Sequence, residues 1–204
     1  NSPVSFEFYP IMETKYADIN YDQYDMMLSG GYEKKTSDSE IMSANVYDAE
    51  EDEYLFQVSA MTIAPQTTVH YAIYKDIDDG NPASGTLLEE GETFQEWAGY
   101  QRIDLKEAYL LNKGEKYAVV ITQSYDTDEG KTYAVPYPQN ANAAAMLDMG
   151  GVDIKSVLNP GESYIFTDGA WKDFCNYKEE IIKSMAAELA SMDEETGEGT
   201  DEEA

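Results

Sequence analysis

Few side chains in this chain are of the types that make and break bonds. The one histidine, His70, lies in a strand-like pattern between Val69 and Tyr71, and the one cysteine is Cys175. Nucleophilic catalysis needs a base and an orienting third group beside the nucleophile, and the spacing of these residues supports neither. One His and one Cys are also too few for a structural zinc site. The residue types therefore predict no catalytic chemistry of this kind.

Motifs and carboxylate pairs lead in the same direction. The chain has no glycine-rich phosphate loop and no Gly-x-Ser-x-Gly nucleophile motif. Its 41 Asp and Glu residues leave a glycosidase-type acid pair open, but nothing singles out two of them. We therefore expect a binding or spacing module and not an enzyme.

Aromatic side chains are better candidates for contacting a ligand. Trp97 lies at a predicted strand end and Trp171 at a turn, each with polar neighbours. A flat aromatic face can stack on a sugar ring, so Trp97, Trp171, Tyr100 and Tyr137 are the candidate ligand-binding residues. The alternative is that these rings pack at the edge of the core, where large aromatic side chains are commonly found.

Two acidic loops are candidates for calcium, because that ion takes oxygen ligands from alternate positions around a tight turn. The candidate ligands are Asp76, Asp78, Asp79 and Asn81 in the first loop, and Asp126, Asp128 and Glu129 in the second. Neither loop has the full EF-hand pattern with its late glutamate. The alternative is that Asp and Asn are present only as good turn formers. Calcium is the one cofactor that the sequence suggests.

The charge of the chain excludes two classes of partner. Lys and Arg number 13 against 41 Asp and Glu, which gives a formal net charge of −28 at pH 7. This charge repels phosphate backbones and anionic lipid heads, so neither nucleic acid nor a membrane surface is expected as a partner. No apolar run approaches the roughly 18 residues that a membrane-spanning helix needs. With 42% apolar residues, the chain still has enough material for a folded core.

Most of the chain is expected to be β-structure. Residues 1–42 form an extended lead-in with a short strand or two, and residues 43–175 alternate strand-like runs with turn signals. This pattern predicts a mostly β chain, an antiparallel β-sandwich of jelly-roll-like type. In one such run Tyr54, Phe56, Val58 and Ala60 alternate with polar residues, and they are expected on one face of a half-buried strand.

Helices are expected in two places. Residues 141–149 favour a short helix because they are rich in Ala, Met and Leu. Residues 176–192 are predicted to form a C-terminal helix, because Ile181, Met185 and Leu189 fall on one helical face. Residues 193–204 are an acidic tail that should be solvated unless a partner binds it.

Four segments together carry a resemblance to a known family. They are Ala44-Asn-Val-Tyr47, Gly99-Tyr-Gln-Arg-Ile-Asp-Leu105, Leu111-Asn-Lys-Gly-Glu-Lys-Tyr-Ala-Val-Val120 and Gly161-Glu-Ser-Tyr-Ile-Phe-Thr-Asp-Gly-Ala-Trp171 with the following Lys-Asp. In this order they resemble the lectin-like domain found beside papain-like cysteine peptidase domains in secreted proteins of Clostridia and related gut Firmicutes. The Tyr21-Asp-Gln-Tyr-Asp25 stretch is similar to the segment that leads into that domain.

The resemblance implies an antiparallel β-sandwich, an extracellular or cell-surface location, and a non-catalytic accessory role. Its presumed ligand is a glycan or cell-wall carbohydrate, and its presumed neighbour is a papain-like peptidase domain whose catalytic motifs have no counterpart here. The family pattern also implies a closing strand after Trp171-Lys-Asp, where this sequence predicts a helix. We interpret the chain as an accessory domain that binds carbohydrate or positions an adjacent peptidase. The alternative is a structural or protein-interaction module that uses the helical face or the tail.

Overall fold

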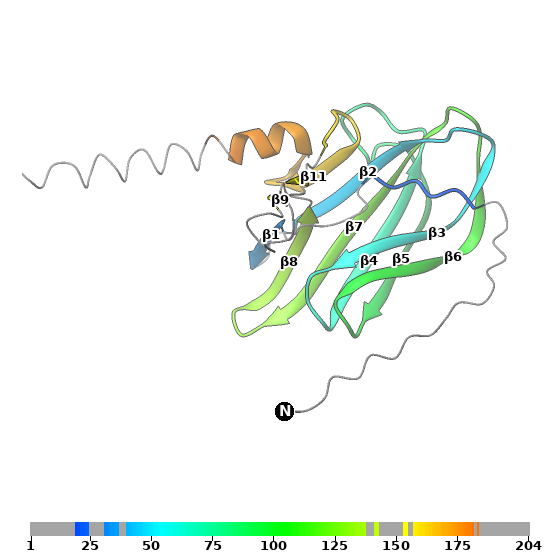
Figure 1. Cartoon of the computed structure of the whole chain (residues 1–204). Helices are drawn as coiled ribbons and strands as arrows, with labels where there is room; N and C mark the ends of the chain where they lie inside the picture. Colours follow the sequence, from blue (N-terminus) through cyan, green and yellow to red (C-terminus); the bar gives the residue numbers. More distant parts are fainter. Residues whose placement is uncertain are drawn as a thin grey trace, which may run out of the picture.

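The computed structural model describes residues 19–24, 31–36, 40–137, 141–142, 153–154, 157–181 and 183. Their regular structure is mostly β, arranged as two packed layers (Figure 1). The strands are β1 (Gly31–Thr36), β2 (Met42–Asp48), β3 (Glu53–Thr62), β4 (Thr67–Lys75), β5 (Thr86–Gln95), β6 (Gly99–Leu111), β7 (Lys116–Thr127), β8 (Gly130–Tyr137), β9 (Ala141–Asn142), β10 (Asp153–Ile154), β11 (Ser163–Thr167) and β12 (Ala170–Asp173).

The larger layer is an antiparallel sheet built around β7. One edge of β7 pairs with β4, which in turn pairs with β5. The other edge pairs with β2 over the first half of β7 and with β8 over the second half. Beyond β2 the sheet continues with β11 and β12, and beyond β8 it continues with β1. On this edge of β7 the sheet therefore divides into two branches, one formed by β2, β11 and β12 and the other by β8 and β1.

The second layer is the antiparallel pair of β3 and β6, which lies across the main sheet (Figure 1). Its inward side chains pack against β4 and β7 in one apolar cluster. The buried members are Val58, Ala60, Val69, Tyr71, Ile73, Ile103 and Ile121. These two layers and the antiparallel ladders confirm the predicted mostly β sandwich. Within the described residues β3 pairs only with β6.

The segment around Gly114 shows why one of the recognised sequence pieces is a turn. Gly114 has φ +80°, a conformation that glycine adopts without steric cost. The Glu115 carboxylate accepts hydrogen bonds from the Asn112 backbone N–H at 2.8 Å and from Lys75 Nζ at 3.0 Å. This turn fixes where β7 starts, and β7 carries much of the inner face of the sheet.

One predicted alternation is wrong in its first half. The register of β3 against β6 shifts between Leu55, which pairs with Tyr109, and Gln57, which pairs with Asp104, so the extra residues lie on β6. Tyr54 and Phe56 are 62% and 45% exposed, whereas Val58 is buried as predicted. Across this irregular pairing the face that each β3 side chain occupies changes, so strict alternation fails.

A helix follows β12 directly, at the point where the family pattern implies a further strand. Residues 174–181 and 183 are helical, so the helix begins two residues before the predicted start at 176. The Asp173 carboxylate explains this start, because it accepts a hydrogen bond from the Cys175 backbone N–H at 2.9 Å, which is an N-cap contact. Met185, Leu189 and the acidic tail lie outside the described residues.

The helix expected over residues 141–149 falls largely outside the described residues. Its first two residues, Ala141–Asn142, are strand β9, which pairs with β10. No helix in the described part of the chain is long and apolar enough to cross a membrane.

Candidate binding site

A cavity of about 350 Å³ opens between the edge of β3 and the inner face of β2, β7 and β8. Residues 19–24 contribute to its wall, together with residues from β11 and the start of the helix. Tyrosines dominate the lining. They are Tyr21, Tyr24, Tyr47, Tyr54, Tyr100, Tyr117, Tyr137 and Tyr164. The volume falls in the range of small-ligand sites, about 300–1,000 Å³.

Three of the tyrosines form a stacked row that attaches residues 19–24 to the sheet. Tyr24 stacks on Tyr47 with 4.8 Å between ring centroids, and Tyr47 lies 5.3 Å from Tyr117. The Tyr24 hydroxyl donates to the Val46 carbonyl, and the Tyr117 hydroxyl donates to the Asp22 carboxylate. Burial raises the pKa of Tyr24 to about 12 and raises the pKa of Tyr117 further. Both hydroxyls therefore remain protonated donors at neutral pH.

A buried amide contributes an unusual polar group to the cavity. Gln123 on β7 is 2% exposed, and its Nε2 donates to the Met61 carbonyl oxygen at 2.9 Å. Its Oε1 is buried and has no hydrogen-bond partner among the described residues. Leaving such an acceptor unsatisfied costs about 1–3 kcal/mol. A ligand with an O–H or N–H group would supply the missing donor.

Other polar side chains on β2 and β11 lie beside this amide in the lining. Ser163 Oγ donates to Asn45 Oδ1 at 2.9 Å, and Asn45 Nδ2 donates to the Tyr47 hydroxyl at 3.3 Å. Ser43 Oγ donates to the Ile121 carbonyl at 3.4 Å. The cavity thus combines aromatic rings with amides and hydroxyls, which can bind a polar ligand that also has apolar faces.

The charged side chains of the lining are mostly acidic. Asp22, Glu53 and Glu162 line the cavity with Arg102, so three carboxylates and one guanidinium give a formal charge of −2. Burial raises the pKa of Glu53; a hydrogen bond from Asn20 lowers it, and the neighbouring carboxylates raise it again. The cavity is therefore electrostatically unfavourable for an anion.

Neither candidate nucleophile nor base reaches this cavity. His70 and Cys175 are absent from its lining. His70 Nε2 lies 2.9 Å from Glu92 Oε2 on the exposed surface of β4 and β5. Burial raises the pKa of the Cys175 thiol, whereas an activated cysteine has a lowered pKa. These contacts give no support to a His70 and Cys175 pair.

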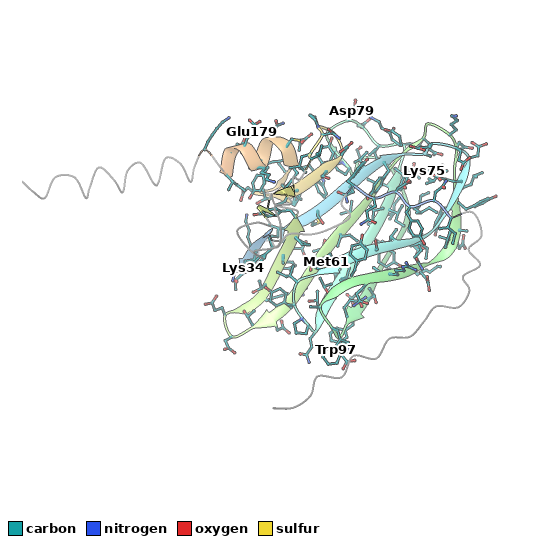
Figure 2. The ribbon with its side chains drawn as sticks, viewed as in Figure 1. Lys34, Met61, Lys75, Asp79, Trp97 and Glu179 are labelled. Atoms are coloured by element: carbon teal, nitrogen blue, oxygen red, sulfur yellow. The ribbon has the colours of Figure 1, made fainter. Side chains whose placement is uncertain are left out.

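The structure separates the four predicted ligand-binding residues. Tyr100 and Tyr137 line the cavity, whereas neither tryptophan does. Trp97 is 70% exposed in the loop between β5 and β6, at the end of the molecule far from Asp79 (Figure 2). Trp171 packs edge-on against Phe166, with 5.4 Å between ring centroids.

Strand pairing explains why Trp171 does not reach the cavity. Trp171 is the register partner of Phe166, and Phe166 is the partner of Met42. Met42 precedes the cavity-lining Ser43, and consecutive side chains point to opposite faces of a sheet. Trp171 therefore belongs to the opposite face, where it packs against the cluster around Val120.

The predicted calcium loops are partly occupied by other contacts. Asp79 Oδ1 lies 2.9 Å from Lys116 Nζ, and this contact lowers the pKa of the Asp79 carboxyl. Asn81 Oδ1 accepts from the Ala83 backbone N–H at 3.2 Å. Asp126 and Asp128 are exposed at the β7–β8 turn. No group of three or more His, Cys, Asp or Glu in the described residues is arranged to hold a metal, and calcium binding stays a prediction.

Sequence reasoning missed Gln123, although the sequence contains a signal for it. Tyr117, Val119 and Ile121 alternate along β7, and Gln123 occupies the next position of the same face. A polar residue that continues an inward-facing apolar series is a candidate for a buried polar contact.

Comparisons with known proteins agree with this fold. Residues 19–186 match the model of the family described as "Lectin like domain". One similar structure is that of the cysteine protease and lectin-like domains of Cwp84, a surface layer associated protein of Clostridium difficile, with 24% identity and a TM-score of 0.51. It is matched over 72% of this chain and 30% of its own. A search of curated proteins found no match.

A second similar structure is the clostridial cysteine protease Cwp84 in a variant form after propeptide cleavage. It has 23% identity and a TM-score of 0.52, and the match covers 72% of this chain and 34% of that one. The chain thus spans about a third of the length of the solved structures it matches. The family match extends from residues 19–24 through the two layers into the C-terminal helix. The chain therefore belongs to the lectin-like domain family.

Proposed function

We propose that this chain is a non-catalytic accessory domain that binds carbohydrate in the cavity between its two layers. The observation that carries the proposal is the lining, in which tyrosine rings adjoin side-chain amides and hydroxyls in a volume of about 350 Å³. A tyrosine has a flat apolar face and a polar tip, which complement the C–H face and the hydroxyl groups of a sugar ring. Membership of the lectin-like family supports the same function.

The proposed context is the cell surface, beside a peptidase domain. The similar protein Cwp84 is described as a surface layer associated protein with a cysteine protease domain next to a lectin-like domain. A domain that holds a glycan-rich surface would keep an attached peptidase near substrates on that surface, because tethering raises the effective concentration. The parent of this chain is proposed to use the domain in this way.

A glycan array with the purified chain tests carbohydrate binding, and calorimetry then measures affinity for each glycan that binds. Tyr100→Ala should weaken binding by up to about tenfold, the scale of an aromatic contact. Because Tyr100 is 55% exposed, this change should leave the fold intact. Trp97→Ala is the matched control, because Trp97 lies outside the lining. An array without any bound glycan would reject the function; a loss of binding in Trp97→Ala alone would reject the site.

The runner-up function is a protein-interaction module, and one surface observation favours it. Phe94 and Trp97 are 63% and 70% exposed close together in the sequence, at the end of β5 and in the following loop. Exposed aromatic side chains are common anchors of protein interfaces. Surface plasmon resonance with the parent's peptidase domain tests this function, with Phe94→Ser and Trp97→Ser combined. Equal binding by the wild type and the double variant would exclude this surface.

A further inference from the structure

We propose that Gln123 is the hydrogen-bond acceptor that selects the ligand, and that the cavity takes a neutral or amino sugar in preference to an acidic one. This inference rests on the proposed carbohydrate function. It adds the residue that recognises the ligand and the charge class of the sugar.

The orientation of the Gln123 amide is determined by its contact with β3. Nε2 donates to the Met61 carbonyl oxygen at 2.9 Å, and a carbonyl oxygen can only accept. A flipped amide would place Oε1 against that oxygen, with two acceptors facing each other. Oε1 is therefore directed away from Met61, and the side chain has no freedom to satisfy it by rotation.

Gln123 Oε1, the remaining acceptor, can accept a hydrogen bond from an O–H or N–H group of a ligand. Oε1 is buried in a residue that lines the cavity, and it has no partner among the described residues. A methionine at this position would fill similar space without an unsatisfied oxygen. A sugar hydroxyl or amine that donates to Oε1 removes the penalty only in the bound state. Sites of this kind reject analogues that lack the donor, because the buried acceptor is then left unpaired.

The charges of the lining support the preference for a neutral or amino sugar over an acidic one. Asp22, Glu53 and Glu162 outnumber Arg102, and the whole chain carries a formal charge of −28. A uronic acid or a sulfated sugar would enter against both the local and the overall field. An ammonium group on an amino sugar would instead be attracted by the carboxylates and by the faces of the tyrosine rings. A neutral sugar would be neither repelled nor attracted by these charges.

Two variants separate recognition from stability. Gln123→Met costs the hydrogen bond to the Met61 carbonyl but also removes the unsatisfied acceptor, and because these effects offset each other the melting temperature of the free protein should change by only a few degrees. Affinity for the bound glycan should fall about tenfold or more, equivalent to about 1.4 kcal/mol. Gln101→Met is the matched control. The Gln101 amide also donates to a backbone carbonyl, that of Trp97 at 3.4 Å, but Gln101 does not line the cavity.

The ligand set tests the charge class. We would titrate β-1,4-linked tetrasaccharides of glucose, N-acetylglucosamine, glucosamine and glucuronic acid, which share one backbone, together with every glycan that binds on an array. The glucuronic acid member and the acidic array glycans should bind more weakly than their neutral and amino counterparts. Equal or tighter binding of the acidic members would overturn the charge assignment.

The remaining outcomes each decide one claim. Unchanged affinity in Gln123→Met would overturn the role of Gln123 while leaving carbohydrate binding in place. If the wild type bound no glycan at all, the proposed function and this inference would fail together. If Gln123→Met melts far below Gln101→Met, its affinity no longer reports recognition alone. NMR of the wild-type protein then supplies a second test. A ligand-dependent shift of the Gln123 side-chain amide NMR signals supports the proposal, and its absence with bound glycan rejects it.

Discussion

The Gln123 side chain on β7 is joined to the Met61 carbonyl on β3 by a hydrogen bond of 2.9 Å. This bond links the two layers at the border of the cavity, where β3 has no strand partner other than β6 in the described part of the chain. The link holds the edge of β3 against the inner face of the main sheet. It therefore fixes the position of β3 beside the cavity and orients the Gln123 amide.

A buried carboxylate gives the fold a defined response to acid. Glu89 is 5% exposed and accepts hydrogen bonds from the Tyr71 hydroxyl at 2.7 Å, the Tyr109 hydroxyl at 3.0 Å and the Lys106 backbone N–H at 3.0 Å. Burial raises the pKa of Glu89, but these hydrogen bonds lower it more, so its pKa lies below the ordinary value. The carboxylate therefore stabilises the fold above about pH 4.3, and this contribution is lost as the pH falls through the folded-state pKa.

Glu89→Gln should destabilise the protein by about 1–3 kcal/mol at pH 7, because the amide NH2 of the new side chain faces hydroxyl and N–H donors. The difference from wild type should shrink at pH 3, because the contribution of the carboxylate is lost as the pH falls from the unfolded-state pKa toward the lower folded-state pKa. Urea unfolding at both pH values measures this, with the exposed Glu90→Gln on the same strand as control. A difference that is equal at pH 7 and pH 3 would contradict the assignment.

Gly91 is required by the close approach of an aromatic ring. A Cβ at this position would lie 2.5 Å from Tyr71 Oη and 2.6 Å from Tyr71 Cζ. Tyr71 cannot easily move away, because it is packed in the core and hydrogen-bonded to Glu89. Gly91→Ala should therefore cost about 1–3 kcal/mol by overpacking.

A double-mutant cycle isolates this steric effect. In a Tyr71→Val background the ring is gone, and Gly91→Ala should then cost at least about 0.5 kcal/mol less than in the wild type, the lower end of coupling between residues in contact. Chemical denaturation of the four proteins gives the coupling energy. An equal cost in both backgrounds would mean that Gly91 is needed for a reason other than the ring.

Local signals in the sequence were sufficient for the strands and tight turns of the sandwich. The period-two alternation along β7 and the glycine turn at Gly114 depend on neighbouring residues, so they are readable without tertiary contacts. The Gly91 region shows the limit of this approach. A glycine inside a strand-like run commonly indicates a break, whereas β5 is continuous through Gly91, because the glycine accommodates Tyr71 and does not end the strand.

The cavity could not be predicted in the same way, because its lining comes from distant segments. Tyr100 and Tyr137 were identified as ligand-binding candidates by residue type, but Tyr24 reaches the same cavity through its stacking on Tyr47, and Gln123 reaches it through strand pairing across the chain. The irregular pairing of β3 with β6 between Leu55 and Gln57 adds a register shift that has no clear local signal. Long-range register, more than local propensity, therefore decides which side chains face the ligand space.

The contacts of the first acidic loop favour the alternative that its Asp and Asn residues are turn formers, so calcium should have little effect on the stability of the protein. In the first acidic loop Asp79 is already ion-paired with Lys116, so an ion would have to displace an ammonium group. We expect the melting temperature in 5 mM calcium, about the level needed to saturate weak extracellular sites, to match that in chelator. Magnesium at the same concentration controls for general binding to an acidic chain. A rise with calcium alone would establish a specific site, and Asp79→Asn would then locate it.

Residues 19–24 form part of the cavity wall and should be able to detach from the sheet without unfolding the rest of the domain. Two side-chain contacts hold the segment to the sheet. The Tyr24 ring stacks on Tyr47, and the Asp22 carboxylate accepts from the Tyr117 hydroxyl. Tyr24→Ala removes the stacking and should cost about 0.5–1.5 kcal/mol. Tyr117→Phe retains the ring and removes the hydroxyl, which should cost about 1.5–3 kcal/mol because the lost partner is charged.

Hydrogen exchange distinguishes local release of this segment from global destabilisation. In Tyr24→Ala and Tyr117→Phe, backbone amides of residues 20–24 should exchange faster by a larger factor than that of Ile121 in the sheet. Tyr32→Ala, in the exposed strand β1 and outside the lining, should change neither. Glycan dissociation should also accelerate in the two cavity variants, because the same residues bound the ligand space. If all amides accelerated together, the segment would be an integral part of the sandwich, and the cavity wall would not open on its own.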